Sequence, residues 1–179
     1  MVLDWYTIVE ALWLILPAYA VNGLMPLAKG KRPIDFNRKF RGNPIFGAGK
    51  TWEGLVVGLI VGVIIAFVEL TAYPYLPWYL ALRPLEIVPM TTSLGFLLGM
   101  GAVIGDMAGA FIKRRLGMPR GSPAPVLDQD DFVLGALAFA SFLIAIQLEW
   151  VVVLVVITPL FHLIANRIAY WTRVKKEPY

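Results

Sequence analysis

The sequence predicts an all-α, polytopic integral membrane protein with five transmembrane helices. Of its 179 residues, 59% are apolar, against about 45–50% in average soluble domains. Only 16% are charged, against roughly 25% in a typical globular protein, and the mean hydropathy is +0.71. A soluble surface could not be covered with so few polar groups. This composition excludes a soluble enzyme, a disordered tail and a nucleic-acid-binding domain, so we expect no nucleic-acid partner.

Five segments have the length of a transmembrane helix, because a bilayer core of about 30 Å needs about 20 helical residues. They form a single transmembrane domain over the whole chain. The expected helices cover residues 5–28, 54–73, 90–112, 132–148 and 150–171. The last two meet at Glu149-Trp150 almost without a loop, so we expect them to be antiparallel neighbours. Gly54, Gly58 and Gly62, like Gly101, Gly105 and Gly109, recur every four residues and indicate faces where helices pack closely.

The basic residues predict the orientation in the membrane. All of them except Arg83 lie in the segment 29–52, in the segment 113–120 or towards the C-terminus. Five crossings place these three regions on one side, which the positive-inside rule makes cytoplasmic. We therefore expect a multi-pass protein of the cell membrane with its N-terminus outside, its C-terminus cytoplasmic and cytoplasmic loops at 29–53 and 113–131. We expect that such a chain can form a homodimer.

The end of the first cytoplasmic loop indicates an anion-binding site. The run Gly47-Ala-Gly-Lys-Thr51 is similar to a nucleotide P-loop, but Pro44 stands where that motif needs a glycine and no apolar strand precedes it. Backbone amides with Lys50 and Thr51 at the start of a helix still suit an anion. The alternative is a lysine that reaches the interface beside a capping threonine. Asn22, near the cytoplasmic end of the first helix, needs a polar partner in lipid, and a phosphate or a base is a candidate.

The second loop brings together carboxylates of the kind that bind Mg²⁺. Asp106 lies inside the third helix, where a carboxylate is costly and normally faces a cavity or a partner. It shares a helix face with Lys113, so an internal ion pair is the structural alternative. Three more carboxylates precede the fourth helix, at Asp128, Asp130 and Asp131. Mg²⁺ is usually held by one or two carboxylates together with substrate phosphates.

Basic side chains beside these carboxylates complete the predicted site. Lys50, Lys113 and Arg114 would neutralise phosphates around the metal. Because the site lies at a membrane interface, one substrate can arrive from water and the other from the bilayer. The residues therefore predict a lipid phosphoryltransferase or nucleotidyltransferase.

Two segments resemble the phosphatidate cytidylyltransferase family. Lys50-Thr-Trp-Glu-Gly54 is similar to its KTWEG element. The family signature has the form GD…KR…G…LDRxD, and the residues that resemble it are Gly105-Asp106, Lys113-Arg114, Gly117, Leu127-Asp128 and Asp131. Gln129 replaces the arginine of the signature, and Ala108-Gly109 replaces a Glu-Ser pair. With its short chain and five expected helices, the sequence is most similar to the archaeal branch, which acts on an unsaturated diether glycerol phosphate.

The resemblance implies a Mg²⁺-dependent transfer of the cytidylyl group of CTP to a membrane lipid phosphate, with release of pyrophosphate. It implies that Asp106, Asp128 and Asp131 are catalytic and hold the metal, with Asp130 a lesser candidate ligand. Lys113 is implied as a catalytic residue that also binds the triphosphate.

The resemblance also suggests the contacts to the two substrates. For CTP, the remaining expected contacts are Lys50, Thr51, Arg114, Asn22 and Asn43. For the lipid phosphate, the expected contacts are Arg38 and Arg41, although these two arginines suit anionic lipid headgroups equally well.

Two other functions use similar parts. A CTP-dependent polyprenol kinase would transfer a phosphate to a hydroxyl and release CDP without pyrophosphate. A small ion or lipid transporter would place its carboxylates near the middle of the bilayer and show paired repeats. Here the carboxylates gather at one interface, which favours the enzyme.

Overall fold

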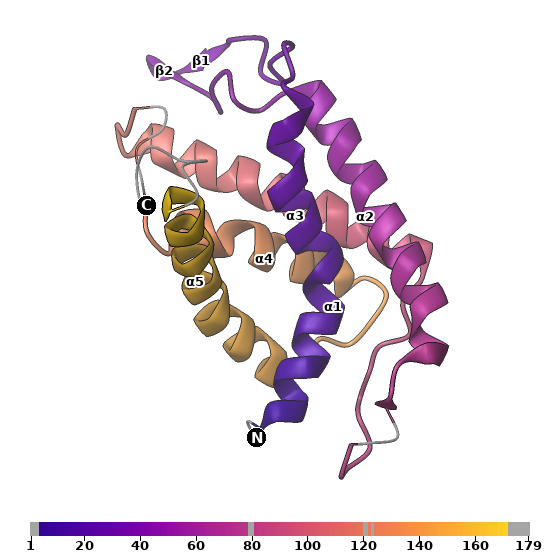
Figure 1. Cartoon of the computed structure of the whole chain (residues 1–179). Coiled ribbons are helices and arrows are strands. Elements are labelled where there is room, and N and C mark those ends of the chain that lie inside the picture. The colour runs from indigo at the N-terminus through magenta and orange to yellow at the C-terminus, as the bar shows by residue number, and fades with distance from the viewer. Residues whose placement is uncertain (1–3, 79–80, 120–121, 123, 172–179) are drawn as a thin grey trace.

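The computed structural model is a bundle of helices with one small hairpin at its end, and it describes residues 4–78, 81–119, 122 and 124–171 (Figure 1). In chain order the elements are α1 (Trp5–Leu24), η1 (Met25–Ala28), β1 (Lys39–Phe40), β2 (Asn43–Pro44), α2 (Trp52–Ala72), η2 (Tyr73–Tyr75), α3 (Thr92–Arg115), α4 (Leu127–Ala140) and α5 (Leu148–Trp171).

The first three expected helices are confirmed, and each begins at a capping side chain. Asp4, Thr51 and Thr91 accept hydrogen bonds from the backbone N–H groups of the first turns of α1, α2 and α3. Among the described residues, three helical segments are long and apolar enough to cross a bilayer, at Trp5–Ala28, Trp52–Tyr75 and Thr92–Arg115. The third helix continues three residues beyond the expected end, so its last turn carries three basic side chains.

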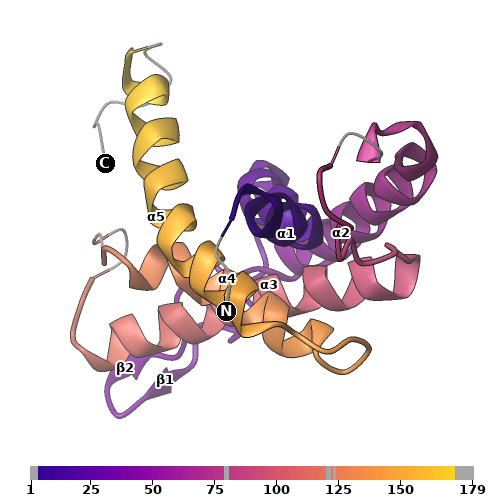
Figure 2. The ribbon, with the colours of Figure 1, turned by 90° about the horizontal axis from the view of Figure 1, so that it is seen from below.

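The fourth helix differs from the sequence prediction. It covers Leu127–Ala140 rather than residues 132–148, and its 14 residues extend only about 21 Å. Residues 141–144 form a turn and a bend, residues 145–147 are irregular and α5 begins at Leu148, so the tight corner expected at Glu149-Trp150 is wrong. Figure 2 shows α5 crossing α4 steeply rather than lying along it. The prediction was wrong because an apolar run does not distinguish a buried helix from an apolar turn that follows it. The second loop is shorter than expected at both ends.

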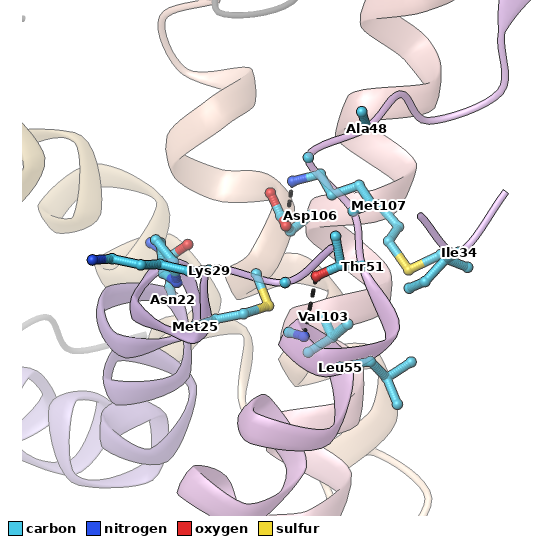
Figure 3. Close-up of a pocket in the computed structure, with 15 residues that line it drawn as sticks. Asn22, Met25, Lys29, Ile34, Ala48, Thr51, Leu55, Val103, Asp106 and Met107 are labelled. Carbon is cyan, nitrogen blue, oxygen red and sulfur yellow. Dashed lines mark hydrogen bonds and ion pairs between the residues drawn. The ribbon is translucent and has the colours of Figure 1, made fainter. Parts of the chain in front are cut away.

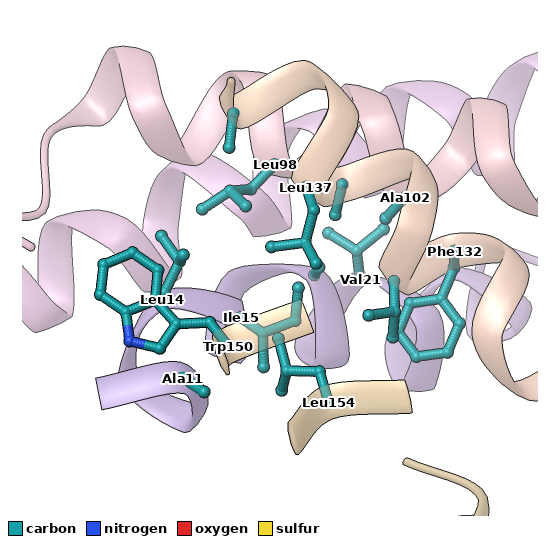
Figure 4. Packing of buried hydrophobic residues seen from close by; sticks show 14 of the residues in the cluster. Ala11, Leu14, Ile15, Val21, Leu98, Ala102, Phe132, Leu137, Trp150 and Leu154 are labelled. Atoms are coloured by element: carbon teal, nitrogen blue, oxygen red, sulfur yellow. The ribbon is translucent and has the colours of Figure 1, made fainter. Parts of the chain in front are cut away.

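The interior is built around α3, which packs against α1, α2 and α4. Glycines allow the closest approaches: a Cβ atom added to Gly62 in α2 would lie 2.7 Å from the carbonyl oxygen of Gly95 in α3. Apolar side chains from four helices fill the space between them (Figure 4). They include Ala11, Leu14, Ile15, Val21, Leu98, Ala102, Phe132, Leu137, Trp150 and Leu154.

The two basic connections lie at the same end of the bundle, as the sequence predicts. In Figure 1 the hairpin and the C-terminal end of α3, which carries the basic residues of the second connection, lie towards the top, and the N-terminal end of α1 and the C-terminal end of α2 lie towards the bottom. At the lower end, Arg83 forms ion pairs with Asp4 and Glu10, each with a 3.0 Å separation. Lys175 and Lys176 of the basic tail lie outside the described residues.

The contact between α3 and α4 should not tolerate a side chain at Gly101. An added Cβ would lie 2.3 Å from the carbonyl oxygen of Gly135, so we expect Gly101→Ala to cost about 1–3 kcal/mol of stability. Gly23→Ala is the matched control, because no atom lies within 4 Å of its added Cβ. Thermal unfolding in one detergent should show a lower midpoint for Gly101→Ala only. Equal midpoints for the two variants would contradict this packing.

Candidate functional site

Two adjoining cavities lie where the first basic connection meets α3. The first, of about 300 Å³, is lined by α1, the connection before α2, the first turn of α2, and α3 (Figure 3). The second, of about 200 Å³, is lined by the same connection, α3 and the start of α4. Gly49, Lys50 and Asp106 line both cavities, so the Lys50–Asp106 pair stands between them.

Lys50 reaches the carboxylate of the third helix. Its Nζ lies 2.5 Å from Oδ2 of Asp106, and both side chains are about one-fifth exposed. The backbone of Lys50 is held on both sides, because its N–H donates to the carbonyl of Gly47 and its carbonyl accepts from the N–H of Ile34. The following residue, Thr51, caps α2. The loop thus presents a cation to α3 from the start of a helix.

Lys113 pairs with Asp128 instead of with Asp106. Its Nζ lies 2.8 and 2.9 Å from the two carboxylate oxygens of Asp128. One of these oxygens also accepts the backbone N–H of Ala124. At the same helix start, Gln129, which replaces the arginine of the family signature, accepts the N–H of Val126. The second connection is therefore tied to the last turn of α3.

Asp131 lines the second cavity together with Asp106 and Asp128. Its Oδ1 accepts the backbone N–H of Phe132 at 2.6 Å. The carboxylates of Asp106 and Asp131 line the same cavity, so a cation there would offset their mutual repulsion. Three carboxylates from two helices therefore converge on a space that favours positive charge.

The expected basic residues have different roles in the structure. Arg114 lines the second cavity, and its guanidinium donates to the carbonyl of Met118. Arg115 donates to the carbonyls of Phe40, Asn43 and Pro44 and thereby fastens the hairpin to α3. Sequence analysis did not single out Arg115, since nothing in a basic run indicates which member faces a carbonyl.

Asp35 organises the first connection and was also missed. It is 6% exposed, and its carboxylate accepts the backbone N–H groups of Asn37, Phe46 and Gly47 at 2.9–3.0 Å. Burial acts to raise the pKa of Asp35, but these three donors outweigh it, so the pKa lies below its ordinary value. The sequence does contain a feature that could have identified Asp35, because it is the one carboxylate between Lys29 and Lys50.

Four of the expected residues lie outside the linings of these two adjoining cavities. Arg38 and Arg41 are exposed on the hairpin, and Asn43 contacts Arg115 through its carbonyl. Asp130 is buried at the start of α4, and neither of its carboxylate oxygens has a hydrogen-bond partner among the described residues. Asn22 does line the first cavity, with its Nδ2 3.4 Å from Nε2 of His162 (Figure 3).

The atoms of the second cavity that could bind a metal suit a hard cation. Carboxylate oxygens surround it, with no sulfur or imidazole ligand in its lining, and this is the ligand chemistry of Mg²⁺. Within the described ranges, no group of three or more acidic, histidine or cysteine side chains has the arrangement of a preformed metal centre. Mg²⁺ is usually held by one or two carboxylates together with substrate phosphates.

Comparisons with known proteins agree on one family. The family model described as CarS-like, CDP-archaeol synthase, matches residues 5–179. A CDP-archaeol synthase from Pyrococcus horikoshii is 47% identical over 173 residues, which cover 96% of this chain and 97% of the relative. One from Pyrobaculum islandicum is 44% identical over 170 residues, covering 93% and 95%.

A solved structure is similar over most of the chain. It is described as an intramembrane enzyme for archaeal membrane lipid biosynthesis, and the TM-score is 0.76 at 37% sequence identity. The match covers 89% of this chain and 94% of the solved one. The helical architecture and the sequence therefore point to the same group of proteins.

The lowered pKa of Asp35 predicts acid sensitivity of the folded state. A carboxyl whose pKa is lower in the folded than in the unfolded chain stabilises the protein above its unfolded pKa of about 3.9. That contribution is lost as the pH falls through the folded value. We expect the unfolding midpoint of wild type to fall more steeply between pH 6 and pH 3 than that of Asp35→Asn. Parallel profiles by differential scanning fluorimetry would contradict the assignment.

Proposed function

The chain belongs to the CDP-archaeol synthase family, and we propose that it transfers the cytidylyl group of CTP to an unsaturated diether glycerol phosphate, forming CDP-archaeol and pyrophosphate. It is a membrane-embedded cytidylyltransferase of archaeal lipid biosynthesis. The observation that carries the finer proposal is the convergence of Asp106, Asp128 and Asp131 with two lysines around one cavity at an end of the apolar helices.

We assign a metal role to these three carboxylates. They would hold Mg²⁺, which supplies positive charge for the triphosphate and for the charge that develops on pyrophosphate as it leaves. Asp130 is a weaker candidate than its neighbours, because it is buried and is not among the residues that line the cavity.

The two lysine–aspartate pairs support an exchange of partners when CTP binds. Lys50 and Lys113 each neutralise one carboxylate in the structure. A triphosphate that enters with a divalent cation would draw the lysines to phosphate oxygens and leave the carboxylates to the metal. A lysine suits such an exchange because its ammonium is a compact charge on a flexible stem.

The remaining CTP contacts follow from the adjoining cavities. Thr51 and Arg114 would complete the triphosphate site from opposite sides, and the first cavity has room for the nucleoside beside Asn22. Asn43 lines a third cavity, of about 530 Å³, which shares Gly47 and Arg114 with the second, so it stays a candidate contact to CTP from that side.

In the proposed reaction, a lipid phosphate oxygen attacks the α-phosphorus of CTP. The new P–O bond forms as the bond between the α-phosphorus and the bridging oxygen of pyrophosphate breaks. The acceptor is already ionised, so no general base is needed. Positioning and positive charge supply the catalysis. Arg38 and Arg41, exposed on the hairpin, would attract the lipid phosphate or other anionic headgroups at the membrane surface.

We place the site on the cytoplasmic face of the cell membrane, with the N-terminus outside. The basic connections gather at the site end, as the positive-inside rule requires. Five crossings remain compatible with the short α4, because the turn after it continues to the opposite end. There the side chain of Gln147 contacts Glu86, and Nε1 of Trp150 donates to Glu10. A homodimer is a further possibility that cross-linking in membranes would test.

The activity is tested with purified protein in detergent, Mg²⁺, labelled CTP and two acceptors, digeranylgeranylglyceryl phosphate and diacyl phosphatidic acid. We expect pyrophosphate release and label in the ether lipid only. Asp106→Asn should lower the rate by about 10²–10³-fold, and chelation of Mg²⁺ should abolish it. Glu86→Gln, a carboxylate change at the opposite end, is the matched control and should keep wild-type activity.

Each contrary result has a distinct meaning. Label in both lipids would keep the chemistry and remove the ether specificity. A phosphorylated lipid with CDP and no pyrophosphate would favour a polyprenol kinase. No labelled lipid from either acceptor would overturn the cytidylyltransferase proposal for this chain.

A further inference from the structure

We propose that Asp35 is a positioning residue that holds the ammonium of Lys50 against Asp106. The proposal deepens the proposed function, because it rests on Lys50 as a triphosphate contact for its effect on CTP. Asp35 itself lines neither cavity of the site. It acts through the backbone of the connection between η1 and α2.

The Asp35 carboxylate bridges two parts of that connection. Its Oδ1 accepts the N–H of Asn37 at 2.9 Å, within its own turn. Its Oδ2 accepts the N–H groups of Phe46 and Gly47, both at 3.0 Å, eleven and twelve residues further along the chain. Asp35 thereby closes the hairpin-bearing loop at its base, where the side chain is almost entirely buried.

Hydrogen bonds connect the residues around Asp35 directly to the backbone of Lys50. The carbonyl of Gly47 accepts the N–H of Lys50 at 3.2 Å, and the N–H of Ile34, next to Asp35, donates to the carbonyl of Lys50 at 2.8 Å. Both backbone groups of Lys50 are therefore bound to residues that Asp35 holds or adjoins. Gly47 has a φ of +95°, so the turn that leads to Lys50 adopts a conformation that depends on glycine and on these bonds.

The charge of Asp35 matters as well as its shape. A carboxylate accepts all three N–H groups, whereas an asparagine of the same size has only one oxygen and would turn an NH₂ group towards at least one donor. Hydrogen bonds to a charged group are also roughly twice as strong as neutral ones. Asp35→Asn should therefore loosen the turn at Gly47 and let the Lys50 side chain leave Asp106.

The first measurement is the reactivity of individual lysines in the full-length protein in detergent. Mass spectrometry after brief treatment with an amine-acetylating reagent should show Lys50 labelled several-fold faster in Asp35→Asn than in wild type. Lys113, paired with Asp128 in the same site, serves as an internal reference and should not change. Asp4→Asn removes a carboxylate that also accepts backbone and side-chain donors, at the opposite end, and should leave Lys50 unchanged.

The second measurement is a double-mutant cycle on CTP binding, by calorimetry with CTP and Mg²⁺. We expect Asp35→Asn to weaken CTP affinity by about tenfold, the loss of about one charge-assisted hydrogen bond. In a Lys50→Met background the same change should have no further effect, because Asp35 acts through Lys50. A residue that merely stabilised the fold would give additive losses.

The outcomes separate this inference from the proposed function. Faster labelling of Lys50 and Lys113 together, or additive losses of CTP affinity, would overturn the positioning role. If Lys50→Met leaves CTP affinity unchanged while Asp35→Asn still exposes Lys50 alone, the positioning of Lys50 stands and its role as a triphosphate contact fails.

Discussion

The close approach of α3 and α4 is the constraint on which the site depends. A Cβ atom added to Gly105 would lie 2.1 Å from the carbonyl oxygen of Asp131, and one added to Gly109 would lie 1.9 Å from its Oδ2. The glycine face that packs the helices against each other therefore also makes room for a carboxylate at the end of the bundle that holds the site. Without that glycine face, Asp131 could not lie next to Asp106, and the second cavity would lose one of the three carboxylates that line it.

Charge compensation then decides which elements meet at this end. A carboxylate in a poorly hydrated place needs a cation or several donors. Asp106 obtains Lys50 from the first connection, and Asp128 obtains Lys113 from α3. The first pair joins residues 56 positions apart and the second joins the consecutive helices α3 and α4, so the electrostatic requirement of the carboxylates also assembles the cavity. The connection can supply Lys50 only because Asp35 closes it.

The sequence alone predicted those features of the fold for which a residue type has only one plausible environment. Long apolar runs predicted α1, α2 and α3, and costly intramembrane or clustered charges indicated Asp106, Lys113 and Asp128. Prediction failed where the same run of residues is compatible with several structural environments that the linear sequence does not distinguish. Apolar residues suit the turn after Ala140 as well as a longer helix, so the end of α4 was wrong. Partner choice is a three-dimensional property, so neither the Lys113–Asp128 pair nor the backbone contacts of Asp35 could be derived from spacing.

Carboxylates at the two ends of the bundle are paired with different cations, an arginine at one end and lysines at the other. This difference distinguishes the end that is structural from the end that holds the site. At the lower end Arg83 binds Asp4 through two nitrogens and Glu10 through one, and it holds the pKa of Asp4 below its usual range. A guanidinium fork fixes direction as well as distance, so this contact resists exchange. At the site end the cations are lysines, whose ammonium groups can turn to a phosphate without breaking a planar geometry. The fixed pairs at one end thus fasten the connection between α2 and α3 to α1, while the lysine pairs lie at the cavity where we propose that the triphosphate and its metal bind.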